Sequence, residues 1–422
     1  MASRVLLVGS GAREHAVAWK LRQSPSVDDI FVAPGNAGTA LLATNIPVQP
    51  KDIDGLVAAA EAHRVDFYLA TMDDPQPLGL VDRLQANGIL CYGPSAAASQ
   101  IEASKWFAKT LMLELGIPTA RGESFTDFEA ARSYLGTLLD RPIVIKADGL
   151  AAGKGVIVCS GHDDAAEALD IIMRRRDFGS AGDRVIIEER LQGWETSAHA
   201  FCDGRTARLM PFASDYKRAG DGDIGLNTGG MGAFSPTVAV GGDLQSVVAD
   251  EVVDRLIAGM AERGYPFAGT LFPGLMITDD GPRVLEYNAR FGDPETQVLM
   301  PRLQSDLFEI ARAAAEGRLA DQAIEWSEDA AVGVVLASGG YPATYKLEYV
   351  IEGLDDLDDG VLAFHAGTRD SDRGLVTNGG RVVTIVASGA TVAEARKRAY
   401  DNVARIHFTD MHYRRDIAAG VE

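Results

Sequence analysis

The chain has 422 residues, of which 46% are hydrophobic, and a formal net charge of −20. This length exceeds what one hydrophobic core supports and indicates two to four packed units. The excess of acidic residues argues against nucleic-acid binding, and no run of roughly 18 apolar residues is present that could span a membrane.

The N-terminus and the cysteines both predict a cytoplasmic protein. The first four residues lead directly into an apolar strand, so no signal peptide is expected. Cys91, Cys159 and Cys202 are odd in number and widely spaced. This pattern favours buried, reduced thiols over a disulfide framework or a metal site.

The first hundred residues are typical of a doubly wound βα unit. Buried strands are predicted at 5–8, 30–33 and 67–70, and a helix begins near His15. The amides at that helix start, after Gly11, predict an anion site with Arg13 as a candidate contact, and the alternative is that Arg13 only caps its helix. A dinucleotide is the alternative ligand, but no acid follows the second strand at the expected distance, so a single phosphate is favoured.

Residues 142–158 predict a hairpin that can lie against phosphates. Lys146 ends the first apolar run, and Gly153, Lys154 and Gly155 lie in the loop before the second. Glycine lets the main chain approach a phosphate closely, and Lys154 adds a positive charge at the tip. The segment is not a Walker loop, because no Gly-Lys-Ser/Thr precedes a helix. A plain turn is the alternative.

Residues 185–197 predict a strand with an acidic exit. The apolar run passes into Glu188, Glu189 and Leu191, and Glu195 follows a short turn. Backbone groups at such an exit can bond an adenine edge, and a carboxylate just beyond can bind ribose hydroxyls. An ordinary strand with a solvated end is an equal alternative.

Residues 284–297 carry the most informative pattern. Glu286 and Asn288 are two apart on a predicted strand, so both side chains point to the same face. A carboxylate and an amide oxygen suit Mg²⁺ (or Mn²⁺), which shares its ligands with nucleotide phosphates. Arg290 follows on that face and can contact a phosphate oxygen. The alternative is a solvated strand end before a Gly-Asp-Pro turn.

The last part of the chain predicts a further unit. An acidic, polar stretch at 319–331 links to strands near 332–338 and 381–387 and to a final helix over 392–407.

Together these segments resemble the ATP-grasp fold and, within it, the phosphoribosylamine–glycine ligase (glycinamide ribonucleotide synthetase) family. The resemblance runs in order from about residue 3 to about residue 417. It is carried by the motifs at 11–15, 33–39, 215–223, 227–236, 288–297, 364–368 and 377–382.

The resemblance implies an α/β protein of three domains. An N-terminal doubly wound parallel-sheet domain would span 1–102. An ATP-grasp domain would span 103–325, with a mobile lid at about 120–187, and a C-terminal α+β domain would span 326–422.

The resemblance also implies the reaction and its partners. ATP and Mg²⁺ (or Mn²⁺) would serve a ligase that joins glycine to 5-phosphoribosylamine in purine biosynthesis. We expect a monomer or small homo-oligomer with no nucleic-acid or membrane partner.

Residue roles follow from the same resemblance. Lys105 and Lys146 would hold the α- and β-phosphates, and the loop with Gly153, Lys154 and Gly155 would close over the γ-phosphate. Adenine would lie against the Glu188–Leu191 exit, Glu195 would bind ribose, Glu286 and Asn288 would bind the metal, and Arg290 would neutralise the phosphoryl group. The remaining assignments are catalytic roles for Lys154, Arg290, Asp215 and Lys217, and substrate contacts for Gly11, Arg13, Asp73, Asp293 and Arg381.

Departures from the family pattern cluster in the loops at 9–12, 71–76 and 340–348. Asp73 stands where the family has a glutamate, and Glu348 stands near a position where it has a glycine. Two hypotheses fit: the family's own ligase with diverged loops, which is favoured, or a paralogue that uses a different amine or amino acid. A non-enzymatic nucleotide-binding regulator is disfavoured because the metal pair and the loop lysine are both present.

Overall fold

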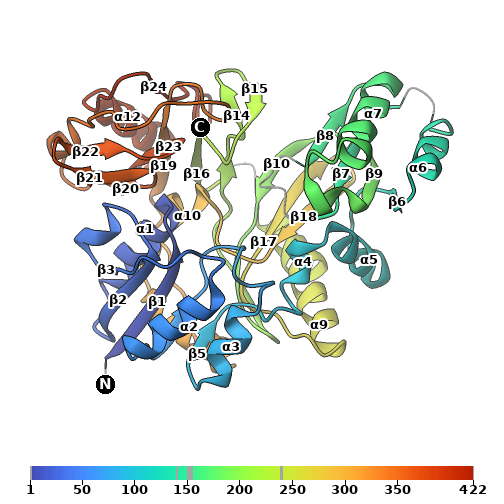
Figure 1. Ribbon diagram of the computed structural model, residues 1–422. Coiled ribbons are helices and arrows are strands. Elements are labelled where there is room, and N and C mark those ends of the chain that lie inside the picture. Colours follow the sequence, from blue (N-terminus) through green and yellow to red (C-terminus); the bar gives the residue numbers. More distant parts are fainter. Residues whose placement is uncertain (1, 139–140, 150–154, 238–240, 422) are drawn as a thin grey trace.

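A computed structural model describes residues 2–138, 141–149, 155–237 and 241–421. Four groups of elements make up the molecule, and three of them surround the strands β17 and β18 (Figure 1). None of the helices in these ranges is long and apolar enough to cross a membrane.

The first group is a five-stranded parallel sheet in the order β3-β2-β1-β4-β5. Its strands and helices are β1 (Ser3–Gly9), α1 (Ala12–Leu21), β2 (Val27–Pro34), β3 (Thr44–Asn45), α2 (Ile53–Ala62), β4 (Phe67–Leu69), α3 (Leu80–Ala86) and β5 (Leu90–Tyr92). The strand order changes direction between β1 and β4. The turn after β1 therefore lies at the switch point where such sheets bind ligands.

Two helices then lead into the second group. They are α4 (Gln100–Ala103) and α5 (Lys105–Leu115). The hydroxyl of Ser104 accepts a hydrogen bond from the Phe107 amide, and Gly116 ends α5 with a φ of 65°. These caps fix where α5 begins and ends, and therefore where Lys105 and Lys109 lie.

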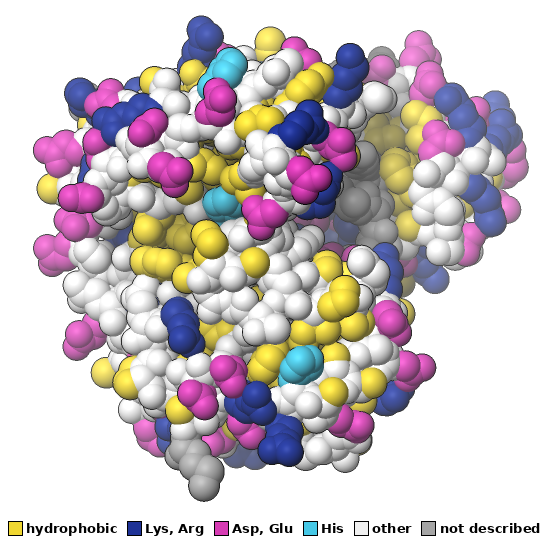
Figure 2. Space-filling model, turned by 60° about the vertical axis from the view of Figure 1, so that its left-hand side comes forward, with side chains coloured by type: hydrophobic (Ala, Val, Ile, Leu, Met, Phe, Trp, Pro, Cys, Tyr) yellow, Lys and Arg dark blue, Asp and Glu magenta, His cyan; other side chains and the backbone are white. Residues whose placement is uncertain are grey.

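The second group is a small four-stranded antiparallel sheet, here called the small unit, in the order β6-β9-β7-β8. Its elements are β6 (Gly122–Phe125), α6 (Phe128–Leu135), β7 (Ile143–Ala147), β8 (Val156–Cys159), α7 (His162–Leu169) and β9 (Val185–Glu189). It has its own hydrophobic core, which includes Ile145, Leu169 and Ile187. Figure 2 shows it standing apart from the rest of the molecule across a hollow.

The third group is the central sheet, in the order β10-β17-β11-β12 with β18 paired to β17. Its elements are β10 (Trp194–Ser197), β11 (Ala200–Asp203), β12 (Ala207–Leu209), α8 (Gly242–Val247), α9 (Arg255–Glu262), β17 (Ala268–Thr278), β18 (Gly281–Asn288), α10 (Glu295–Leu299) and α11 (Leu307–Ala315). Residues of α10 and α11 share a core with β1 and α1, so the first and third groups are packed together.

The fourth group is a sheet in the order β13-β16-β19-β23-β20, with β24 paired to β19. Two of its strands come from the middle of the chain, because β16 pairs with β19. Its elements are β13 (Ser214–Asp215), β16 (Gly232–Ser235), β19 (Ala330–Ser338), β20 (Leu362–His365), β23 (Arg381–Gly389), α12 (Val392–Val403) and β24 (Met411–His412), with hairpins β14 (Arg218–Gly220)–β15 (Ile224–Asn227) and β21 (Thr368–Ser371)–β22 (Gly374–Thr377).

The final helix ends earlier than the sequence predicts. α12 stops at Val403, and the chain turns so that Ile406 and Phe408 are buried while His407 pairs with Glu352. Burial of these two apolar side chains therefore outweighs one more helical turn.

A buried arginine ties the C-terminal residues to the hairpin β14–β15. Arg414 is 1% exposed, and its guanidinium donates to the carboxylates of Asp416 and Asp223 and to the carbonyl of Arg218. The hairpin directly follows Asp215 and Lys217, which belong to the candidate site. Arg414, near the end of the chain, therefore helps to fix the position of this segment.

The predicted strands at 5–8, 30–33, 67–70, 332–338 and 381–387 lie within β1, β2, β4, β19 and β23, apart from Ala70, which directly follows β4. All three cysteines are free and buried, as predicted. The domain boundaries at 102 and 325 stay a prediction.

Candidate active site

A bulge in β18 brings the first charged groups together. The pairing with β17 skips Leu285, because Gly274 faces Glu286 while Leu275 faces Val284. The carbonyl of Leu285 accepts a hydrogen bond of 3.0 Å from Nζ of Lys146 on β7. The bulge thus links the central sheet to the small unit beside Glu286.

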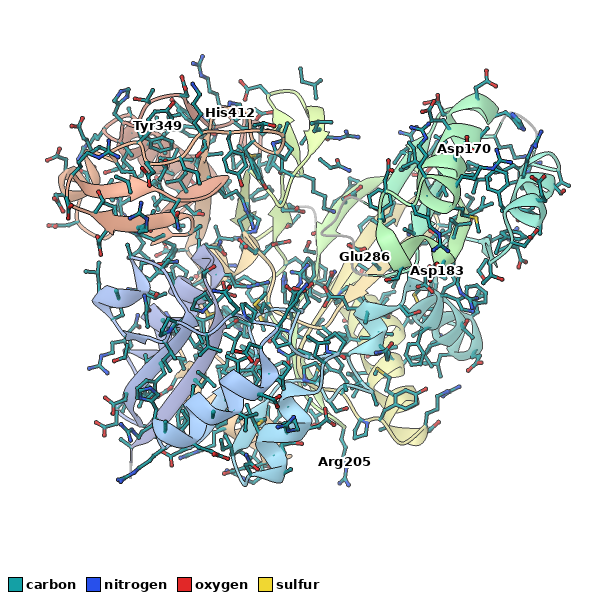
Figure 3. The ribbon with its side chains drawn as sticks, in the orientation of Figure 1. Asp170, Asp183, Arg205, Glu286, Tyr349 and His412 are labelled. Atoms are coloured by element: carbon teal, nitrogen blue, oxygen red, sulfur yellow. The ribbon has the colours of Figure 1, made fainter. Side chains whose placement is uncertain are left out.

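Glu286 lies near the middle of the molecule, between the small unit that carries Asp170 and Asp183 and the C-terminal sheet (Figure 3). Burial raises the pKa of its carboxyl, but nearby cations more than offset this and hold the pKa below its usual value. These cations are Lys105, Lys217, Lys146 and Arg290. Glu286 is therefore a carboxylate at neutral pH, surrounded by positive charge.

Asn288 and Arg290 complete the end of β18. The Asn288 side chain donates to the Phe272 carbonyl (3.2 Å), and its Oδ1 accepts from Nη2 of Arg290 (3.2 Å). Glu286 and Asn288 supply one carboxylate and one amide oxygen, a donor set that suits Mg²⁺ when phosphate oxygens supply the rest. In the described ranges no group of three or more His, Cys, Asp or Glu could hold a metal alone.

Glu188 is shared by two lysines. Its carboxylate lies 2.8 Å from Nζ of Lys109 and 2.7 Å from Nζ of Lys146. Burial raises the pKa of Glu188, but the two ammonium groups hold it below its usual value. Because two positive charges surround one negative charge, a net positive charge remains for an anionic ligand.

Lys109 is a residue that the sequence analysis missed. It is 2% exposed and also donates to the Thr119 hydroxyl and the Ala120 carbonyl. One signal could have found it: Lys109 falls between Ala108 and Met112 on the apolar stripe of α5.

Lys217 joins two of the predicted acids. Its Nζ lies 2.8 Å from Glu195 and 4.0 Å from Asp215. Asp215 and then Glu195 raise the pKa of Lys217 against its burial, and burial raises the pKa of Asp215. Glu195, predicted to bind ribose, thus already has a cationic partner on the half-exposed face of β10.

Asp293, Arg381 and Gly11 bring three groups of elements together. Arg381 bonds both carboxylate oxygens of Asp293, at 2.7 Å (Nη2–Oδ2) and 3.2 Å (Nη1–Oδ1). A Cβ placed at Gly11 would lie 3.6 Å from Asp293 and 2.8 Å from Glu14. No side chain therefore fits at Gly11 unless Glu14 moves.

The predicted anion site at the start of α1 has an internal partner. The Gly11 amide donates to the Glu14 carboxylate (2.7 Å), and Nε of Arg13 bonds the same carboxylate (2.7 Å). Arg13 also donates to the Phe291 carbonyl (3.1 Å). The structure thus shows Arg13 as a buried link to the central group, and its contact with a substrate phosphate stays a prediction.

The other predicted residues border the same region. Asp73 lines a small hollow with Gln76, Ser99, Glu102 and Ala289. Lys105 donates to the Gly149 carbonyl (3.3 Å), and Gly155 accepts from the Ala147 amide (2.8 Å). Gly153 and Lys154 lie outside the described residues.

At the β9 exit, two amides are already bonded. The Glu189 amide donates to the Arg121 carbonyl and the Arg190 amide to the Pro142 carbonyl, and the half-buried Leu191 follows. An adenine base that binds at this exit must therefore form hydrogen bonds with other backbone groups, such as those of Leu191.

A small antiparallel sheet whose Lys146 bonds the central sheet, next to Glu286 and Asn288 near the end of β18, is the arrangement of an ATP-grasp ligase. Models of the phosphoribosylglycinamide synthetase N domain, ATP-grasp (A) domain and C domain match residues 3–102, 103–296 and 331–420. The chain belongs to the phosphoribosylglycinamide synthetase family. The predicted fold class and ligase assignment are confirmed.

Individual relatives agree with this. A phosphoribosylamine–glycine ligase of Vibrio cholerae is 47% identical, and the match covers 98% of this chain and 97% of that protein. A crystal structure of the Thermotoga maritima phosphoribosylamine–glycine ligase covers 98% of this chain and 100% of its own, at 35% identity and a TM-score of 0.87.

A third relative is longer. The trifunctional purine biosynthetic protein adenosine-3 of Gallus gallus is 47% identical over 99% of this chain. The chain spans 42% of that protein.

Proposed function

We propose that the chain joins glycine to 5-phosphoribosylamine with ATP, through a glycyl phosphate, in purine biosynthesis. The products are glycinamide ribonucleotide, ADP and phosphate. The observation that carries the proposal is the end of β18, where Lys146 bonds the Leu285 carbonyl next to Glu286 and Arg290 bonds Asn288. Such a site accepts a polyphosphate together with a cation.

The nucleotide would lie between the small unit and the central sheet. Lys146 bonds Glu188 and Leu285, which leaves its third N–H for an α- or β-phosphate oxygen. Lys105 donates to the Gly149 carbonyl beyond β7 and is proposed to contact the same phosphates, and Lys154 remains the proposed γ-phosphate contact. Glu286 and Asn288 would hold Mg²⁺ (or Mn²⁺), which when bound would neutralise charge on the transferring phosphoryl group.

The chain's own residues would then position two successive substitutions. A carboxylate oxygen of glycine attacks the γ-phosphorus, the bond to ADP breaks, and Arg290 stabilises the charge on the transferring group. The amine of phosphoribosylamine attacks the resulting acyl carbon, loses a proton and expels phosphate. A closing small unit would protect the acyl phosphate from water.

A second candidate keeps this chemistry with a different amine or amino acid. One specific observation favours it: Glu348, which lies in a diverged loop, has a left-handed φ of 66° and is held by Arg369 (2.8 Å). Tyr341 from the same loop accepts a hydrogen bond from the Gly229 amide, next to the contact between Arg381 and the Gly229 carbonyl. The diverged loop thus lies beside the proposed amine region.

The test is ADP release with glycine and phosphoribosylamine, followed by a panel of other amines and amino acids. Turnover that requires both substrates supports the proposed ligase. Normal ATP binding without turnover on phosphoribosylamine, but with turnover on another amine, supports the paralogue. We further propose domains at 1–102, 103–325 and 326–422. We also propose a monomer or small homo-oligomer, and sedimentation would measure the mass of the assembly.

A further inference from the structure

Glu102 lies at the junction between the first sheet and the central sheet, and it has no role in the chemistry described above. It is on the short helix α4 and is 9% exposed. Its Oε2 accepts a hydrogen bond of 2.7 Å from the Ala289 amide, and its Oε1 accepts one of 3.0 Å from Nε of Arg290. One carboxylate thus binds two successive residues just beyond the proposed metal ligands.

The guanidinium of Arg290 is held on all three nitrogens. Besides Nε, its Nη1 donates to the Phe291 carbonyl (3.1 Å) and its Nη2 to Oδ1 of Asn288 (3.2 Å). The group also lies 5.7 Å from the centre of the Phe272 ring. A guanidinium has five N–H groups, so these bonds leave one on each terminal nitrogen for an incoming oxygen.

We propose that Glu102 is a positioning residue that orients Arg290 toward the transferring phosphoryl group. This proposal rests on the proposed function, in which Arg290 stabilises the charge on that group. Glu102 binds Nε of the guanidinium. The one free N–H on each terminal nitrogen is then held in a single orientation toward the ligand. Asp73, 3.9 Å from Nε of Arg290, adds a second negative charge on the same side.

The position of α4 adds a consequence for assembly. Glu102 belongs to the segment that leaves the first sheet, whereas Arg290 belongs to the central group. The phosphoryl contact is therefore fixed only when these two groups are packed together. A misplacement of about 1 Å in such a group can lower turnover by about a hundredfold.

Steady-state kinetics of single and double variants would test the proposal. Glu102→Gln keeps one acceptor oxygen for the Ala289 amide but replaces the oxygen that binds Nε of Arg290 with an NH2 group, which cannot accept a hydrogen bond. We expect kcat to fall by about ten- to a hundredfold. We expect the KM for ATP and the melting temperature to change little. Glu102→Asp keeps both acceptor oxygens and should retain more kcat than Glu102→Gln.

The double variant separates positioning from a structural role. In an Arg290→Ala background, Glu102→Gln should lower kcat by no more than about twofold further, because the group that it orients is gone. Glu114→Gln is the matched control. Glu114, on α5, forms an exposed ion pair with Arg263 (2.9 Å), so its replacement should leave kcat unchanged.

Two results would overturn the proposal while leaving the role of Arg290 intact. One is a normal kcat for Glu102→Gln when Arg290→Ala is impaired, and the other is losses that multiply in the double variant. If Arg290→Ala itself turns over normally, the assigned role of Arg290 is wrong and the proposal falls with it.

Discussion

Asp293 and Arg381 form a two-pronged ion pair that joins the turn before α10 to the start of β23. Arg381→Lys keeps the charge but cannot form both contacts, because an ammonium lacks the planar fork of a guanidinium. We expect the KM for phosphoribosylamine to rise about tenfold, equivalent to about 1.4 kcal/mol, with the KM for ATP nearly unchanged. Initial rates with each substrate varied would measure both values. An equal rise in both would place the pair outside the amine site.

Replacement of Glu286 tests the proposed metal and nucleotide site. Glu286→Ala removes the one carboxylate among the two proposed ligands. We expect ligation to fall by at least about a hundredfold with folding intact, because such charge clamps supply several kcal/mol. ADP release and circular dichroism would measure the two effects. Near-normal turnover at ordinary Mg²⁺ concentrations would show that the metal binds elsewhere.

Removal of Glu188 tests the buried charge cluster. Glu188→Ala leaves the ammonium groups of Lys109 and Lys146 without their shared carboxylate in a buried site. We expect a loss of about 3–5 kcal/mol in the free energy of unfolding of this part of the molecule. Denaturant titration followed by hydrogen exchange in β7 and β9 would measure it. A double variant that also replaces Lys109 by Met should recover part of the loss.

His15 predicts a specific pH dependence of stability. Burial, and then His365, lower its pKa to about 3, so the folded chain keeps the imidazole neutral. Its Nδ1 accepts a hydrogen bond of 2.9 Å from the His365 amide. In the unfolded chain a histidine takes up a proton below about pH 6.5. The free energy of unfolding therefore decreases as the pH falls below that value, until the pH reaches the pKa of the folded chain.

His15→Asn keeps an acceptor near Nδ1 but does not titrate in this range. Any stability advantage of the wild type over this variant should shrink by about 2 kcal/mol between pH 6.5 and pH 5. Both proteins share all other titrating groups. Carboxyl groups whose pKa is raised in the fold contribute to the free energy of unfolding with the opposite sign, and this contribution cancels in the difference. Denaturant titrations at the two pH values measure it, with His407→Asn as the exposed control. A difference that stays constant would show that His15 is not held neutral.

Much of the fold could be predicted because its strands are short apolar runs bounded by turn residues. The runs at 5–8 and 332–338 are buried on both faces and have continuous hydrophobic sequence. The addition of β13 and β16 to the C-terminal sheet could not be predicted in this way. Their pairing with β19 depends on long-range contacts that local periodicity does not record.

The site shows the same division. The proposal that Glu286 and Asn288 bind the metal came from the sequence, because two oxygen donors two residues apart on a strand point to the same face, and it stays a prediction. Glu102 could not be predicted, because a single acid near a helix start is usually solvated, and its burial here results from packing against Ala289 and Arg290. The family's own motifs, rather than spacing, led to Asp293 and Arg381, which lie 88 residues apart.

The clamp formed by Arg414 has a consequence for the timing of synthesis. Arg414 is made 191 residues after Asp223, to which it bonds. At about 5–20 residues per second, a ribosome takes roughly 10–40 seconds to cover that distance. During this interval the nascent chain already holds the lysines of the small unit, while the hairpin after Lys217 lacks the residues that fasten it. A growing chain that has passed Arg290 therefore holds the residues proposed to bind the nucleotide before Arg414 can fasten the hairpin that follows Lys217.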